Sequence, residues 1–228
     1  PNLVNVNLTG GEPFLRGDLV DIARSYFRNT SIESIYLTSN GGFPDRVERF
    51  ARTLAQEFPD RKLIVSLSID AFAAEHDRIR KVDGLFDKAL DTYRRLTSIG
   101  GGVMANIGIT VSHENHDIVP DLYEHLIGEQ GVRAITAILV RDEGVHEVPL
   151  AHKEAVLGAY TWLTGTISRD LRSGHLDGYD PRSLQGRLMN RKNELLWEIL
   201  AETYLEPRYV SRCYAASLFG VVDADGTV

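Results

Sequence analysis

The feature that most constrains the fold is an alternation of short apolar runs with amphipathic stretches along the first two-thirds of the chain. Runs rich in Val, Ile and Leu predict five strands, at residues 3–8, 34–37, 63–69, 103–111 and 134–140. Several of them lack in/out alternation, which predicts burial on both faces of a sheet. The unit of one strand and one helix recurs about every 30 residues, the usual size of a β–α unit. Such units build a parallel sheet, either open or closed into a barrel.

Helices are expected between these strands. Apolar residues recur there at steps of three and four residues, which places them on one helix face. The stripes begin at Leu19, Val47, Phe86 and Ile118. We therefore expect five parallel strands, adjacent in chain order, with helices packed on the outer face of the sheet.

The pattern changes after about Val148. Two long helical stretches are predicted near residues 150–171 and 184–204, followed by a short apolar run at 218–222 and a turn at 223–226. The chain thus divides into an α/β part at 1–148, a helical segment at 149–210 and a tail at 211–228. The tail predicts the start of a small β-hairpin extension, and both ends of the chain predict a piece of a longer protein.

The composition limits the classes of binding partner and the compartment that are expected. The net charge is −7, and neither a nucleic acid nor an anionic membrane surface is expected without a basic face. No apolar run approaches the length of a membrane span. The single cysteine excludes an internal disulfide and favours a reducing compartment, so we expect a cytoplasmic protein.

Polar residues follow every predicted strand. In parallel β–α folds, ligands bind at the carboxyl ends of the strands. The five polar segments are residues 9–13, 38–41, 66–70, 112–115 and 141–143. Five such ends predict one ligand site, with Glu12, Asn40, Ser68 and Asp70 facing one cleft.

The segment Gly10-Gly11-Glu12-Pro13 is the most specific of these signals. Two glycines let a ligand approach the backbone closely, and Pro13 removes a hydrogen-bond donor. Glu12 adds a carboxylate. A loop that offers mainly acceptors suits a ligand with an ammonium group.

Residues 8–16 resemble the GGEP segment of radical S-adenosylmethionine (SAM) enzymes, in the position after a strand that the family gives it. Residues 39–41 and 65–70 resemble the ends of the next two strands. Residues 75–80 and 84–87 resemble a stretch common in members with a C-terminal SPASM or Twitch extension. The resemblance covers residues 3–141 and the tail around Cys213. It implies a partial (β/α)6 TIM-like barrel.

The resemblance also implies roles for particular residues. Glu12 and the Gly10–Gly11 backbone, with Pro13, would hold the ammonium group of SAM. Other candidates for cofactor contacts are Ser39, Asn40, Ser68 and Asp70 and, by strand position only, Asn115 and Arg141. The implied reaction is reductive cleavage of SAM to a 5′-deoxyadenosyl radical, which takes a hydrogen atom from a peptide or a small-molecule substrate.

The family's main cluster ligands are not in this sequence. The Cys-x3-Cys-x2-Cys motif of the family precedes GGEP and holds a [4Fe–4S] cluster, so its ligands are expected outside the chain as given, which alone is expected to be inactive. Cys213 resembles the first ligand of an auxiliary iron–sulfur cluster, with the next ligand expected three residues after Val228. An electron donor such as flavodoxin or ferredoxin is the implied partner.

Two other functions remain open on the sequence. The chain fits a binding module that has lost its cluster, and also a barrel lyase that uses Glu12 or Asp70 as a base. Three spaced cysteines upstream in the native protein would distinguish radical chemistry from both.

Overall fold

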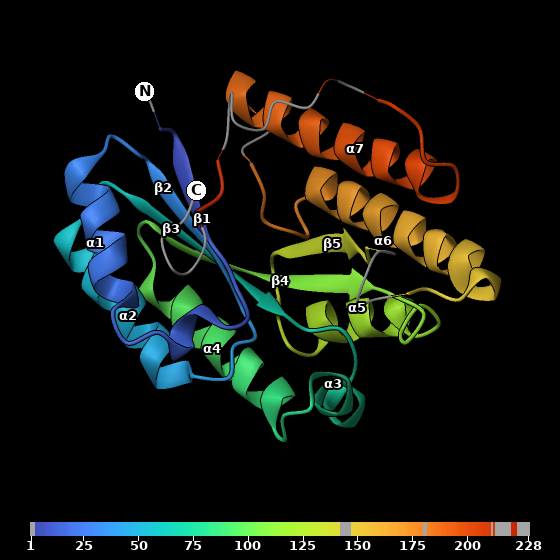
Figure 1. The fold of residues 1–228 in the computed structure, drawn as a ribbon, viewed down its shortest axis with the longest axis horizontal. Helices are drawn as coiled ribbons and strands as arrows, with labels where there is room; N and C mark the ends of the chain where they lie inside the picture. Colours follow the sequence, from blue (N-terminus) through green and yellow to red (C-terminus); the bar gives the residue numbers. More distant parts are fainter. Residues whose placement is uncertain (1–2, 142–146, 180–181, 211, 213–219, 223–228) are drawn as a thin grey trace.

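The computed structural model describes residues 3–141, 147–179, 182–210, 212 and 220–222. Five strands form one sheet in chain order, and each neighbouring pair is parallel. Figure 1 shows β1 near the first helices and β5 beside α6. The strands are β1 (Asn5–Leu8), β2 (Ser34–Ser39), β3 (Lys62–Ser68), β4 (Val103–Val111) and β5 (Ile135–Leu139). The predicted parallel order is confirmed.

Helices connect the strands and extend the chain beyond β5. The elements between the strands are η1 (Pro13–Leu15), α1 (Leu19–Asn29), α2 (Pro44–Glu57), α3 (Ala73–Arg80), α4 (Leu85–Ile99) and α5 (Val119–Gly128). After β5 come η2 (Leu150–His152), α6 (Lys153–Ser173) and α7 (Leu184–Leu205). The sequence did not predict α3, because the helix buries only His76 and has no apolar stripe.

The sheet buries one face, against the helices. Residues 35 and 37 of β2 and residues 63, 65 and 67 of β3 belong to the main hydrophobic core with the helix stripes. The alternate residues of β2, β3 and β5 are half-buried or exposed. The prediction of burial on both faces is therefore wrong for these strands. Their second face carries mainly hydroxyl side chains, with Ile64 and Ile138 between them, and polar side chains do not need an apolar cover.

The end of β2 packs tightly against α4. Gly41 follows β2 with φ +74°, and a Cβ atom there would lie 2.8 Å from Cα of Ala89 in α4. The Thr92 hydroxyl of α4 donates a hydrogen bond of 2.8 Å to the Gly41 carbonyl. A glycine is needed at this position both for its backbone angle and for its lack of a side chain.

Tyr160 of α6 gives a stability prediction. Its ring is fully buried, and its hydroxyl has no partner among the described residues. Burial raises the pKa of Tyr160 to about 12. The Tyr160→Phe protein should be as stable as the parent or more stable by up to about 1 kcal/mol, since an unpaired buried hydroxyl carries a desolvation cost.

A matched control for Tyr160 is Tyr93→Phe. The Tyr93 hydroxyl accepts a hydrogen bond of 2.9 Å from the backbone N–H of Arg133, so its loss should cost about 1 kcal/mol. Chemical denaturation of both variants measures the difference. A large loss of stability in Tyr160→Phe would show that its hydroxyl has a partner after all.

Candidate active site at the carboxyl ends of the strands

Glu12 joins the ends of β1 and β2. Its Oε1 accepts hydrogen bonds from the Phe14 backbone N–H at 3.1 Å and from the Ser39 hydroxyl at 2.9 Å. Its Oε2 accepts one from the Asn40 backbone N–H at 2.7 Å. The structure thus brings together Glu12, Ser39 and Asn40, three of the residues that the sequence singled out.

The Glu12 carboxylate keeps capacity for one more donor. Each carboxylate oxygen has two lone-pair sites, and Oε2 accepts only one of these bonds. The adjoining backbone is accessible, because Gly10 and Gly11 are exposed and a Cβ atom on either would meet nothing within 4 Å. Gly10 has φ +148°, which favours glycine. A ligand with an N–H⁺ group fits beside this carboxylate.

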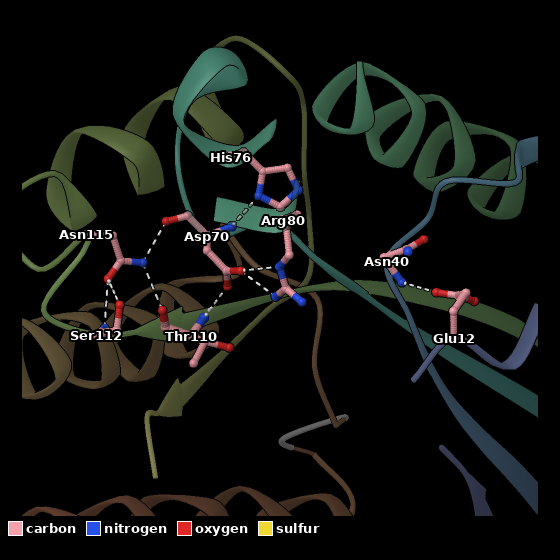
Figure 2. A network of polar contacts seen from close by, with 8 residues as sticks. All are labelled: Glu12, Asn40, Asp70, His76, Arg80, Thr110, Ser112 and Asn115. Carbon is pink, nitrogen blue, oxygen red and sulfur yellow. Dashed lines mark hydrogen bonds and ion pairs between the residues drawn. The ribbon is translucent and has the colours of Figure 1, made fainter. Parts of the chain in front are cut away.

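Asp70 organises a second cluster, at the ends of β3 and β4. Its side chain is 6% exposed and forms a side-on ion pair with Arg80 at the end of α3, with an Oδ2 to Nε distance of 2.8 Å. Its Oδ1 accepts a hydrogen bond of 2.9 Å from the Thr110 backbone N–H. Figure 2 shows both interactions. The carboxylate of Asp70 is therefore committed to protein partners.

Asn115 is fully buried within the same cluster. Its Nδ2 donates to the carbonyls of Asp70 at 2.7 Å and Thr110 at 2.8 Å, and its Oδ1 accepts from the Ser112 N–H at 2.8 Å (Figure 2). Both amide hydrogens are used, so no donor remains for a ligand. The geometry does not support the expected direct contact of Asn115 with a cofactor, because its amide holds the ends of β3 and β4 together.

His76 of α3 supports Asp70 from behind. It is fully buried, and its Nδ1 accepts a hydrogen bond of 3.2 Å from the Asp70 backbone N–H. That bond leaves the proton of the neutral ring on Nε2, which has no partner among the described residues. Burial lowers the pKa of His76 despite the nearby Asp70 carboxylate, so the folded protein keeps this ring neutral.

The lowered pKa of His76 predicts a dependence of stability on pH. The unfolded chain binds a proton at His76 below about pH 6.5, whereas the folded chain does not until a lower pH. The free energy of unfolding should therefore fall as the pH drops from 7 to 5.5, by up to about 1.4 kcal/mol from this group. Denaturation at each pH measures the slope.

Two histidine variants isolate the contribution of His76. The His76→Gln protein should lose this part of the slope, whereas His175→Gln should keep it, because the His175 side chain is 74% exposed. Equal slopes in the parent and in His76→Gln would contradict a neutral, buried His76.

The remaining predicted residues take no part in the hydrogen bonds of these clusters. Ser68 is half-buried at the end of β3, and Arg141 is exposed after β5. Cys213 lies outside the described residues, as does most of the predicted hairpin; residues 220–222 of the tail are described and belong to no strand. Within the described residues, no group of three or more His, Cys, Asp or Glu side chains is arranged to hold a metal ion.

Arg80 is the functional candidate that the sequence analysis missed. Its guanidinium is fixed by Asp70 through Nε and Nη2, and its side chain is 32% exposed. Nη1 is left out of this ion pair. Sequence spacing gave no signal, because the pairing of Asp70 with Arg80 depends on how α3 folds back on β3.

The fold and the site define an α/β half-barrel, a curved parallel sheet with polar clusters at the carboxyl ends of its strands. Residues 1–126 match the Radical SAM superfamily. The chain therefore belongs to the radical SAM superfamily. No helix in the part of the chain that the structure describes is long and apolar enough to cross a membrane.

Individual relatives are more distant. The chain is 26% identical over 145 residues to pre-heme d1 synthase of Dinoroseobacter shibae. The aligned residues cover 64% of this chain and 30% of that protein. It is 37% identical over 93 residues to GTP 3′,8-cyclase of Cronobacter sakazakii, and this alignment covers 38% of this chain and 26% of that protein. The chain thus spans about a third or less of these relatives.

Solved structures share the fold. The protein anSMEcpe with bound AdoMet superposes with a TM-score of 0.55 at 20% identity, covering 77% of this chain and 47% of that one. Its complex with AdoMet and the Cp18Cys peptide gives 0.55 at 21% identity, covering 77% and 50%. At this identity, the likeness supports the α/β half-barrel architecture alone.

Proposed function

We propose that this chain forms the SAM-binding part of a radical enzyme that abstracts a hydrogen atom from a peptide or a small molecule. The observation that carries the proposal is the Glu12 carboxylate, which stands at the end of β1 with a free acceptor site beside open glycine backbone. Membership of the radical SAM superfamily supports it. Relatives act on different molecules, so the substrate is not carried over from any of them.

The two clusters would bind the two charged groups on the α-carbon of the methionine moiety. Oε2 of Glu12 would accept a hydrogen bond from the ammonium group, and the Gly10–Gly11 backbone would lie against the ligand. Arg80 would donate from Nη1 to the carboxylate, a charge-assisted contact that Asp70 orients. Ser68 is a candidate for a hydroxyl contact to the ribose, and Arg141 for a further contact. The buried Ser39 hydroxyl instead donates to Glu12 and accepts from the Gly41 N–H, so it would orient the carboxylate.

The described residues do not supply an iron–sulfur site. The sequence has one cysteine, Cys213, which lies outside them, so the thiolates of a [4Fe–4S] cluster would come from elsewhere in the native protein. When bound, such a cluster would supply the electron that cleaves SAM. We further propose Cys213 as a ligand of an auxiliary cluster in a SPASM/Twitch-like extension, and a cytoplasmic flavodoxin or ferredoxin as the electron donor.

Glu12→Gln in the native protein tests the proposal. Glutamine offers one acceptor oxygen to the three donors that Glu12 binds, and its amide would face one of them. The affinity for SAM should fall about tenfold, equivalent to about 1.4 kcal/mol, since bonds to charged groups contribute about 1.5–3 kcal/mol each. Equilibrium binding of SAM to the anaerobically reconstituted protein measures it.

The control for Glu12 is Glu154→Gln, which changes an exposed carboxylate in the first turn of α6. It should leave SAM binding unchanged. The same preparations should release 5′-deoxyadenosine on reduction. If iron and sulfide analysis finds no cluster, and no 5′-deoxyadenosine is released, the binding module or the lyase would be favoured instead.

A further inference from the structure

The second face of the sheet is polar across its middle. Strand register places Thr38, Ser66 and Asn106 side by side on β2, β3 and β4. The next row holds Ser68, Gly108 and Thr136 on β3, β4 and β5. Thr38 and Thr136 are exposed, and Ser66 and Asn106 are half-buried. These side chains face away from the helix-covered core, because successive residues of a strand point to opposite faces.

Gly108 lies buried between two neighbouring side chains of this face. A Cβ atom there would lie 3.2 Å from the Ser66 hydroxyl oxygen and 3.4 Å from Cδ1 of Ile138, so these two side chains already cover the glycine. Beside it, Nδ2 of Asn106 donates a hydrogen bond of 2.7 Å to the Thr136 hydroxyl. This bond fixes the Asn106 amide and leaves its Oδ1 and second N–H without a partner among the described residues.

The strands carry almost no charge. Among the residues of β1 to β5, Lys62 alone is charged, and it is the first residue of β3. It precedes Ser66 by four residues, which is about 13 Å along a strand. Arg80 stands at the opposite end and is already paired with Asp70. The middle of the face therefore offers hydrogen bonds without charge.

The connection between α6 and α7 closes the amino-terminal end of this face. Its residues 174–179 are here called the strap. The Asp177 N–H of the strap donates a hydrogen bond of 2.6 Å to the carbonyl of Arg133, two residues before β5. Leu176 is buried, and the hydroxyl of Tyr179 lies near that of Tyr36 on β2. Burial and the neighbouring Tyr36 hydroxyl raise the pKa of Tyr179. Figure 1 shows the strap leaving α6 beside β5.

We propose that this uncharged face binds a neutral group of the substrate that both donates and accepts hydrogen bonds, such as a peptide amide, and that Asn106 determines specificity for it. An amide side chain with a free acceptor and a free donor is complementary to another amide. A polyphosphate or carboxylate group would lie there without a cation. This inference rests on the proposed function for the identity of the substrate site, and it makes the strap the floor of that site.

Disulfide exchange at residue 104 tests the inference without cofactor or substrate. Met104 precedes Asn106 by two residues on the same face and is 46% exposed. In a chain with Met104→Cys and Cys213→Ser, the one thiol is equilibrated with the symmetrical disulfide of N-acetylcysteamine, a neutral amide, or of 3-mercaptopropionate, an anion, each in competition with the disulfide of 2-mercaptoethanol. The protein thiol attacks the reagent disulfide, forms a mixed disulfide and releases one reagent thiol. Mass spectrometry gives the amount of each mixed disulfide relative to that formed with 2-mercaptoethanol. The reference is Ser98→Cys on the same background, at an exposed position of α4.

The ratio of the amide mixed disulfide to the anion mixed disulfide should be about fivefold higher at residue 104 than at residue 98. One net hydrogen bond has an effect of this size. Asn106→Leu should remove this preference, and Thr136→Val, which keeps the shape of the side chain, should reduce it. Equal ratios at residues 104 and 98, or a preference that survives both substitutions, would overturn the inference. Neither result depends on cluster assembly or SAM cleavage, so failure here is distinct from failure of the proposed function.

Discussion

The Asp70→Ala protein should lose about 3 kcal/mol of unfolding free energy. Removing one partner of a buried ion pair costs about 3–5 kcal/mol, and we expect the lower end because Arg80 keeps 32% exposure. The substitution also leaves the N–H of the half-buried Thr110 without its acceptor. Chemical denaturation at neutral pH measures the change.

Two further variants separate the causes of this loss. Asp83→Ala removes an exposed carboxylate in the loop before α4 and should change stability by less than about 0.5 kcal/mol. Arg80→Met combined with Asp70→Ala should cost less than the sum of the two single losses, because residues in contact are not additive. A loss in Asp70→Ala no greater than in Asp83→Ala would show that the ion pair contributes nothing.

Gly41→Ala should destabilise the protein by about 2–5 kcal/mol. A left-handed backbone angle at a residue other than glycine costs about 1–2 kcal/mol, and the new Cβ atom would overlap the backbone of α4 at 2.8 Å. Because α4 is a core helix, it cannot move away without opening its packing against the sheet. The expected result is a lower midpoint of chemical denaturation with an unchanged slope.

Gly131→Ala is the matched control for Gly41. Its φ of +67° is close to that of Gly41, but a Cβ atom there would meet nothing within 4 Å. It should therefore show the backbone cost alone, about 1–2 kcal/mol. If the two variants lost the same stability, close contact between β2 and α4 would not be the reason for a glycine at residue 41.

The strands and most helices could be predicted from the sequence because their apolar residues repeat with the period of the element. The helix α3 could not, since it is held by Asp70, Arg80 and His76 rather than by an apolar stripe. Burial of both sheet faces was expected from runs of Val and Ile. The hydroxyl and amide residues between them were the better guide to the second face.

The sequence likewise predicted some residues of the candidate site and missed others. Strand position and the resemblance to the GGEP segment together selected Glu12, Ser39 and Asn40, which do meet. Strand position alone selected Asn115, whose amide hydrogens bind backbone carbonyls, and this depends on loop geometry. Arg80 was overlooked because its importance comes from a partner ten residues away.

The two ends of the polar face are built by separate parts of the chain. The carboxyl end, with Glu12, Asp70 and Arg80, lies within residues 1–126, which match the superfamily. The strap at the other end follows that region. Substitutions, insertions or deletions in the strap can therefore change the depth of the face during evolution without altering the residues proposed to hold the cofactor. Natural variants of this protein with different substrates should differ first in residues 174–179.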